Sequence, residues 1–331
     1  MGAMKSCSSD PSRRAFLLDG SSMRMAHTPE LCGRYPAGSN QHGEAHWPLL
    51  KIVVAHDLQT GLAMRPEWGP MHGPDAVSEQ RLVEMAIERL PNESVVVGDA
   101  NFGVFSVAWA AAQCRHPVVL RLTTSRAQKL ANQAPLRDGT DRELVWKASA
   151  YERKQHPALA MDARVSGRLI VRQVKPDNSE PFLLALFTTL PGALEEILNL
   201  YAQRWKIETD LRTLKSNLNL DQFTCSTPDM VAREIEMAMA AYNLVRAIMC
   251  QAAEQSGLPP RGYSFTQVQR IVRKFGPRLA EARNPAEAKR MYEQMMYYVQ
   301  QAKLPRRRKR PTYPREVWQR GAYFPSRNSK K

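Results

Sequence analysis

The stretch ESVVVGDANFGVFSVAWAAAQCRHPVVLRL (residues 93–122) decides the fold class of this chain. Its first apolar run stops at a glycine and Asp99, which is typical of a buried strand that ends in a turn. VFSVAWAAAQC (104–114) predicts a helix, and HPVVLRL (116–122) predicts a second strand. A strand, a helix and another strand in this order indicate an α/β arrangement around a central sheet.

The same alternation continues upstream. RRAFLLDG (13–20) predicts a strand with Asp19 at or near its end, and PLLKIVVAHDLQTGLAMRP (48–66) predicts two β-rich runs joined by a hairpin at DLQTG. DAVSEQRLVEMAIERL (75–90) has helical periodicity and begins with Asp and Ser in capping positions. The first part of the chain, residues 1–122, therefore reads as strand, strand, strand, helix, strand, helix, strand.

The chain changes character twice downstream. Residues 123–190 contain short strand-like runs separated by turn residues, which favours a β-rich insertion. Residues 191–300 have helical patterns, and the end, 301–331, is basic and interrupted by prolines, as in a flexible tail. We therefore expect four parts with boundaries at 122, 190 and 300.

The composition points to a polyanionic partner. Lys and Arg number 47 against 32 Asp and Glu, a net charge of +15, which favours nucleic acid over an acidic membrane. Hydrophobic residues make up 43% of the 331, enough for a buried core. No apolar run approaches the roughly 18 residues of a membrane span, and no signal peptide is visible, so we expect a cytoplasmic protein without membrane contact. Five scattered cysteines exclude a disulfide framework and a zinc ribbon.

A second informative stretch is YAQRWKIETDLRTLK (201–215), which has a helical pattern. At about 100° per residue, Tyr201, Arg204, Glu208 and Lys215 share one narrow stripe, while Asp210 lies on the opposite face. An acid surrounded by an aromatic hydroxyl and two cations suits a metal-bound carboxylate beside phosphate. The ordinary alternative, a solvated Glu208 paired with a neighbouring arginine on the same helix, stays open.

Asp19, Asp99 and Glu208 together make the acid set of a two-metal phosphoryl-transfer site. Mg²⁺ prefers carboxylate oxygens, and two ions about 3.5 to 4 Å apart need a shared ligand and one private acid each. Asp57 competes with Asp19 because it also ends an apolar run, although it precedes a turn sequence and suits the usual role of a turn aspartate. Asp99 has the alternative role of a helix N-cap.

The spacing Tyr-x2-Arg-x3-Glu-x6-Lys resembles the signature of the DDE transposases of insertion-sequence family four. LLDGSSMRM (17–25) is similar to the first-acid strand of that family, and VVVGDANFG (95–103) is similar to its second-acid strand. RLTTSRA (121–127) and AYNLVRAIM (241–249) also follow the family's order, so the resemblance covers nearly the whole chain.

This resemblance implies an RNase H-like catalytic core with a β-rich insertion between the second and third acids, followed by a helical C-terminal part. The implied reaction is Mg²⁺-dependent cleavage at transposon ends and strand transfer into target DNA, with two Mg²⁺ ions for which Mn²⁺ is an expected substitute. Asp19, Asp99 and Glu208 would hold the metals. The residues expected to contact DNA are Tyr201, Arg204, Lys215, Arg121 and Arg126, the last two from their position at the end of a predicted strand.

The implied partners are transposon ends and target DNA, with a homodimer on the DNA and a location at the bacterial nucleoid. Two departures from the family pattern stand out: Ala100 replaces the arginine that commonly follows the second acid, and only 18 residues precede Asp19, too few for the usual N-terminal DNA-binding region. Two alternatives follow, a noncatalytic DNA-binding remnant and a metal-dependent nuclease. For Trp146 in the insertion, base stacking and a place in the core both remain open.

Overall fold

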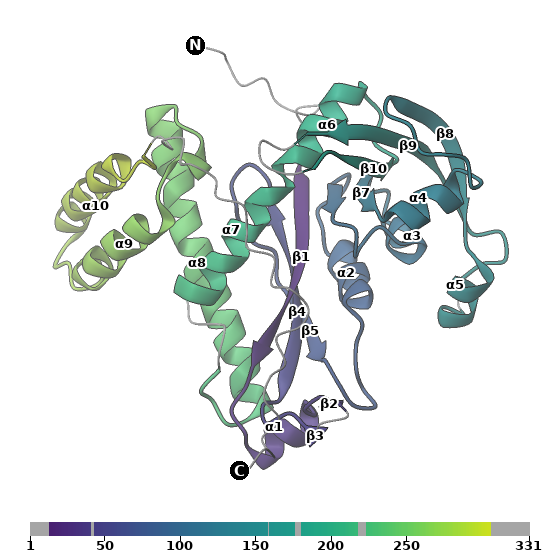
Figure 1. Cartoon of the computed structure of the whole chain (residues 1–331). Helices are drawn as coiled ribbons and strands as arrows, with labels where there is room; N and C mark the ends of the chain where they lie inside the picture. The colour runs from purple at the N-terminus through teal and green to yellow at the C-terminus, as the bar shows by residue number, and fades with distance from the viewer. Residues whose placement is uncertain (1–12, 41–42, 158, 176–179, 218–222, 306–331) are drawn as a thin grey trace, which may run out of the picture.

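The computed structural model describes residues 13–40, 43–157, 159–175, 180–217 and 223–305. Its centre is a mixed eight-stranded sheet with the strand order β5-β4-β1-β6-β7-β10-β9-β8 (Figure 1). The strands of this sheet are β1 (Ala15–Arg24), β4 (Leu49–Asp57), β5 (Glu67–Pro70), β6 (Val95–Gly98), β7 (Val118–Leu122), β8 (Thr140–Lys147), β9 (Arg164–Val174) and β10 (Phe182–Thr188). A small separate sheet pairs β2 (Ser39–Asn40) with β3 (Gly43–Glu44).

The three central strands are parallel, because β6 pairs in parallel with β1 on one side and with β7 on the other. The flanking pairs are antiparallel, including β1 with β4 and β4 with β5. The order of strands and helices expected for residues 13–122 is confirmed, and short helix α1 (Pro29–Arg34) and the β2–β3 pair are additions to it.

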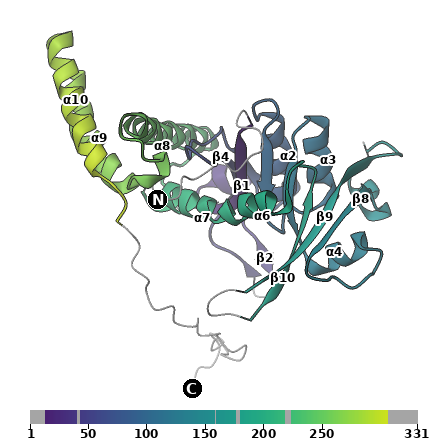
Figure 2. The same ribbon diagram turned by 90° about the horizontal axis from the view of Figure 1, so that it is seen from above.

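Helices cover both faces of the sheet. The two views place α2 (Glu79–Glu88) and α3 (Phe105–Gln113) on one side of β1 and the long α8 (Pro228–Ser256) on the other (Figures 1 and 2). Each side has its own core, because alternate strand residues point to opposite faces. The remaining helices are α4 (Thr124–Leu130), α5 (Ala150–Gln155), α6 (Leu194–Ala202), α7 (Lys206–Arg212), α9 (Phe265–Ala280) and α10 (Pro285–Gln301).

Strand β1 runs past Asp19, so the expectation that a strand ends near Asp19 is wrong. Gly20, Ser21 and Ser22 continue the antiparallel pairing with β4 as far as Arg24. The physical reason is that an adjacent strand supplies partners for the backbone groups of these small polar residues, although their side chains are typical of a turn.

The strands of residues 123–190 extend the central sheet instead of forming a sheet of their own, because β10 pairs with β7. Trp146 of β8 is buried and lies edge-on to Phe105 and Phe187, with ring centroids 6.1 and 4.9 Å away. The sequence left base stacking and a place in the core open for Trp146, and the structure supports the place in the core.

Residues 201–215 do not form one regular α-helix. After α6, residues Gln203–Trp205 form a 3₁₀ turn (η1), α7 follows, and Thr213–Asn217 form a π-helical turn (η2). The uniform angular spacing assumed for the stripe therefore holds only in part, since each helix type advances by a different angle per residue.

No helix in the described part of the chain is long and apolar enough to cross a membrane. Residues 306–331, most of the expected basic tail, lie outside the described residues.

Candidate active site

The parallel pairing of β1 with β6 brings Asp19 and Asp99 to the same level of the sheet. Leu17 pairs with Val97, and each aspartate lies two residues beyond its member of that pair. Residues two apart point to the same face, and neighbouring strands are about 4.8 Å apart. Both aspartates therefore lie on the face that packs against α6, α7 and α8, with Leu17 and Val97 in the core beneath them.

The carboxyl group of Asp19 is partly buried and lies near several other charged side chains. Burial is the main cause that raises the pKa of its carboxyl group from 3.8 to about 6, and the nearby charges of Asp99 and Glu79 raise it further. The Gly20 amide, which donates a hydrogen bond of 2.8 Å to Asp19 Oδ1, and the Arg204 guanidinium act in the opposite direction. An additional positive charge at this position would stabilise the ionised carboxylate.

Asp99 begins the turn that follows β6. Its Oδ1 accepts a hydrogen bond of 2.9 Å from the Asn101 amide, whereas the N-cap of α3 is Val104, so the helix-cap alternative for Asp99 is wrong. Arg126 fixes the same turn from outside, because its Nη1 donates to the Ala100 carbonyl at 2.7 Å. The second acid thus lies on a turn that is held at two points.

The segment 201–208 places a buried aromatic and a buried cation beside these acids. Tyr201 is 7% exposed, and its hydroxyl makes no hydrogen bond of ordinary geometry among the described residues, although the Arg204 guanidinium lies close enough to interact with it. Burial raises the pKa of Tyr201, and the charges of Arg204, Arg121 and Asp99 all act on it, so these groups are neighbours. Arg204 is 8% exposed and lies within reach of both Tyr201 and Asp19.

Glu208 lies on α7, which packs on β1, with 40% of its side chain exposed. Arg204 Nη2, in the 3₁₀ turn before α7, lies 3.4 Å from Glu208 Oε1, so the ion pair four residues apart that the alternative interpretation of Glu208 expects is present. Lys215 follows about two turns later in η2. Among the described residues no three His, Cys, Asp or Glu side chains are grouped closely enough to hold a metal ion, so a three-acid metal site stays a prediction.

The donor set nevertheless fits a hard divalent cation beside phosphate. Asp19 and Asp99 offer carboxylate oxygens at one level of the sheet, and these are the ligands that Mg²⁺ prefers. The buried hydroxyl of Tyr201 is a hydrogen-bond donor without an acceptor among the described residues, and its burial is costly unless an acceptor arrives. A phosphate oxygen held near Arg204 would supply that partner.

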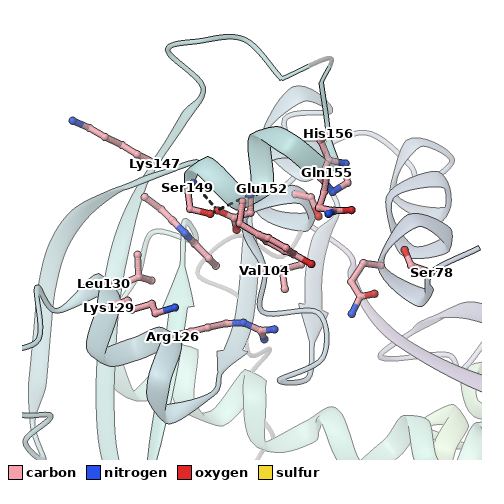
Figure 3. A pocket seen from close by; sticks show the side chains of 14 residues that line it. Ser78, Val104, Arg126, Lys129, Leu130, Lys147, Ser149, Glu152, Gln155 and His156 are labelled. Carbon is pink, nitrogen blue, oxygen red and sulfur yellow. Dashed lines mark hydrogen bonds between the residues drawn. The ribbon is translucent and has the colours of Figure 1, made fainter.

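A hollow of about 660 Å³ is lined by residues that include Val104, Arg126 and Ser149 (Figure 3), and Arg126 connects it to the Asp99 turn through its hydrogen bond to the Ala100 carbonyl. Arg126 and Lys129 of α4 and Lys147 of β8 contribute positive charge to its lining, and Ser149 and Glu152 close one side through their capping-box hydrogen bonds. Arg126 therefore both braces the Asp99 turn and faces a basic hollow. The other arginine expected to contact DNA, Arg121 of β7, is half-buried with its guanidinium 5.6 Å from the centroid of the Phe182 ring.

Sequence reasoning missed the role of Asp210. Its side chain is fully buried on the side of α7 opposite the stripe, where it accepts hydrogen bonds from Arg246 Nη2 at 2.6 Å and Arg261 Nη2 at 2.7 Å. Arg261 also donates to the carbonyls of Leu58 and Asp57. A sequence signal existed, since an acid on the apolar face of a helix requires a buried cationic partner. This cluster fixes α7, and with it Glu208, to α8 and to the turn after β4.

Sequence reasoning also missed Glu79, the first residue of α2. Its carboxylate accepts a hydrogen bond of 2.6 Å from Asn101 Nδ2, two residues after the second acid. By contrast, Asp57 does what a turn aspartate does, because its Oδ1 accepts from the amides of Gln59 and Thr60 and its Oδ2 from Arg14 Nε. The preference for Asp19 over Asp57 therefore agrees with this local geometry.

Comparison with known proteins gives the same assignment as the motifs. Residues 10–244 match the model of the transposase DDE domain. The chain is also 26% identical over 319 residues to "Transposase InsG for insertion sequence element IS4" of Escherichia coli (strain K12), an alignment that covers 93% of this chain and 68% of that protein. The resemblance expected from the sequence is confirmed, and the chain belongs to the family of DDE-domain transposases related to the IS4 insertion-sequence transposase.

Proposed function

We propose that this chain is a DNA transposase that cleaves the ends of an insertion sequence and joins them to target DNA, with Asp19, Asp99 and Glu208 as its catalytic acids. The single observation that carries the proposal is that Asp19 on β1 and Asp99 directly after the parallel neighbour β6 lie at one level of the sheet, on the face covered by the helix that bears Glu208. In this reading the five strands β5-β4-β1-β6-β7 are an RNase H-like core, residues 123–190 are the insertion and 191–300 complete the core and add C-terminal helices.

Asp19 and Asp99 would hold a divalent cation, and Glu208 would join them once its pair with Arg204 opens. Two Mg²⁺ ions, or Mn²⁺ in their place, would supply the charge that activates a water or a 3′-hydroxyl and stabilises the departing 3′-oxygen. Arg204 would then be free to turn toward the phosphate, and the Tyr201 hydroxyl would donate to a phosphate oxygen. Lys215 would contact the same strand from η2.

DNA binding is supported by charge and by the basic hollow. The net charge of +15 favours a polyanion, and each phosphate neutralised on duplex DNA lowers log K by about 0.9 per log unit of salt. Arg126 places a guanidinium beside Ala100, the position where the family commonly has an arginine. Transposon ends and target DNA would thus be the partners, with a homodimer to bring two ends together, in the bacterial cytoplasm at the nucleoid.

The test is Mg²⁺-dependent nicking and joining of DNA that carries the element's ends, with wild type compared with Glu208→Gln at low salt. Loss of nicking with DNA binding retained supports the proposal. Equal nicking by both proteins removes Glu208 from the acid set. Nicked but unjoined products indicate a nuclease, and binding without nicking by either protein indicates a noncatalytic remnant.

A further inference from the structure

The basic hollow shown in Figure 3 lies on the face of the sheet opposite to the one that carries Asp19 and Asp99. Its lining comes from the starts of α2 and α3, from α4 and from residues 146–156. Trp146, in this lining, packs into the core on the side of α2 and α3. The hollow is therefore separate from the position of the two aspartates. It still lies near the carboxyl ends of the parallel strands β6 and β7, because α3 and α4 begin shortly after them.

The lining of this hollow has an excess of positive charge. Arg126 and Lys129 extend from α4, and Lys147 of β8 also belongs to the lining (Figure 3). Glu152 is the single acid among the described lining residues, and its carboxylate is engaged with the Ser149 amide at 2.7 Å. Neither lysine has an acidic partner in the part of the chain that the structure describes. A site with this charge favours an anionic ligand.

Two nearly buried polar groups line the same hollow. Ser106 is 8% exposed and Trp146 is 6% exposed. Neither the Ser106 hydroxyl nor the Trp146 indole N–H makes a hydrogen bond within the described residues, whereas the Trp146 ring is held by Phe105 and Phe187. Burying a polar group without a partner is costly, so these two groups point to a polar ligand inside the hollow.

The size of the hollow decides the kind of anion. Its volume of about 660 Å³ is larger than inorganic phosphate needs and lies within the roughly 300 to 1,000 Å³ of sites for organic ligands. Val104 and Leu130 add apolar surface to the lining. Helix α5, which also lines the hollow, has no buried residue and therefore leaves the space unfilled. A ligand that joins a phosphate to a flat organic group suits this combination.

We propose that this hollow binds one nucleotide, with its phosphate at Arg126 and Lys129 and its base beside Val104 and Leu130. The nucleotide belongs either to a DNA strand or to a free nucleoside phosphate, since both offer the same groups. This inference rests on the proposed function, which makes DNA the partner.

A nucleotide in the hollow would also act on the turn of the second acid. Arg126 donates to the carbonyl of Ala100, and Gln80, another lining residue, donates to the carbonyl and side-chain oxygens of Asn101. These two contacts hold the two residues that follow Asp99. A ligand that orders Arg126 and Gln80 would therefore stabilise this turn.

The experiment measures binding of a fluorescent oligothymidine by anisotropy, with the full chain in EDTA so that no cleavage contributes. Wild type is compared with Ser106→Ala, Lys129→Gln and the control Lys274→Gln, which removes an equal exposed charge from α9 at the other end of the molecule (Figure 1). We expect Ser106→Ala to bind about 2- to 10-fold more weakly at an unchanged Tm. Lys129→Gln should reduce the slope of log K against log salt by about 0.7, the value for one phosphate of a single strand, and Lys274→Gln should not.

Ser106 is too buried to touch DNA on the outer surface, so weaker binding by Ser106→Ala requires a ligand inside the hollow. Competition with thymidine monophosphate then separates the two sources. Displacement at concentrations near that of the oligonucleotide identifies a free nucleotide, and displacement only at a large excess identifies a DNA strand.

Three results each overturn the inference: equal affinity of Ser106→Ala and wild type, an unchanged slope in Lys129→Gln, or an equal loss of slope in Lys274→Gln. The proposed function then still stands if wild type nicks and joins the element's ends. Failure of wild type to bind DNA in either single-stranded or duplex form overturns both.

Discussion

Replacing Asp19 with Asn should stabilise the metal-free protein at neutral and alkaline pH. The unfolded chain ionises Asp19 near 3.8, whereas burial keeps the folded carboxyl group protonated up to about pH 6. Between these values the folded state binds more protons, so its free energy of unfolding falls as the pH rises through this window. Above about pH 6 the ionised carboxylate is a constant penalty, and Asn does not carry it.

The magnitude follows from the two pKa values. The difference between 3.8 and about 6 corresponds to about 3 kcal/mol at 1.36 kcal/mol per pH unit. Asp19 retains some contact with solvent, which screens the penalty, so we expect Asp19→Asn to add about 1 to 3 kcal/mol at pH 8. Asn keeps an oxygen that can accept the hydrogen bond from the Gly20 amide, so this contact survives. The expected rise in Tm is on the order of 2 to 8 °C.

The assay is thermal or urea unfolding in EDTA at pH 4 and pH 8, with wild type and variant compared at each pH. Asp57→Asn is the matched control, because that buried carboxylate is already satisfied by Arg14 and the turn amides, and its replacement should destabilise. The reasoning is refuted if Asp19→Asn is less stable than wild type at pH 8, or if its effect is the same at both pH values. Added Mn²⁺ should stabilise wild type and not Asp19→Asn, since a ligand that binds only the folded state raises its stability.

Three further predictions concern residues around the acids. Asp210→Ala should lower the free energy of unfolding by about 3 to 5 kcal/mol, measured by urea unfolding, because it leaves two buried guanidinium groups without their anion. As a control, Glu236→Ala removes the exposed ion pair with Arg65 and should cost less than about 1 kcal/mol. Tyr201→Phe should leave the Tm unchanged or higher, because the hydroxyl makes no hydrogen bond of ordinary geometry among the described residues, and should weaken DNA binding in a filter or anisotropy assay. Gly103→Ala should lower the Tm by several degrees, because its Cβ would collide with the Arg121 carbonyl of β7, which cannot shift without breaking the sheet; an unchanged Tm would contradict this packing.

The sequence predicted the fold where local patterns and tertiary structure agree. Buried parallel strands such as β6 read as continuous apolar runs, and Ser78 caps α2 as its position suggested. The sequence prediction was wrong where pairing with a neighbouring strand outweighed the preference of the local residues for a turn, as at Gly20–Ser22 in β1. The change of helix type between 201 and 217 was equally invisible, because apolar periodicity does not distinguish 3₁₀ and π turns from an α-helix.

The sequence shows that Asp19 and Asp99 directly follow apolar runs, whereas it gives no sign of the residues that hold the candidate site in place. Asp19 and Asp99 follow apolar runs, and parallel pairing then brings them to one level. Glu79 reaches the same place from a helix on the opposite face, a juxtaposition that depends on the missing side chain at Gly20. Arg246 and Arg261 meet Asp210 from 36 and 51 residues away, and no local pattern encodes such a contact.

The two acids of α7 lie in opposite environments, and in the proposed function only Glu208 would take part in the reaction while Asp210 holds the helix in place. Residues 208 and 210 are two apart, so they lie about 200° apart around a helix and face opposite environments. Asp210 is enclosed by two arginines, and this enclosure fixes the helix in rotation. Glu208 is thereby directed toward Arg204 and keeps a partly exposed side chain. Because Asp210 holds α7 in place, the Arg204–Glu208 pair on the other side of this helix is free to rearrange only through its side chains.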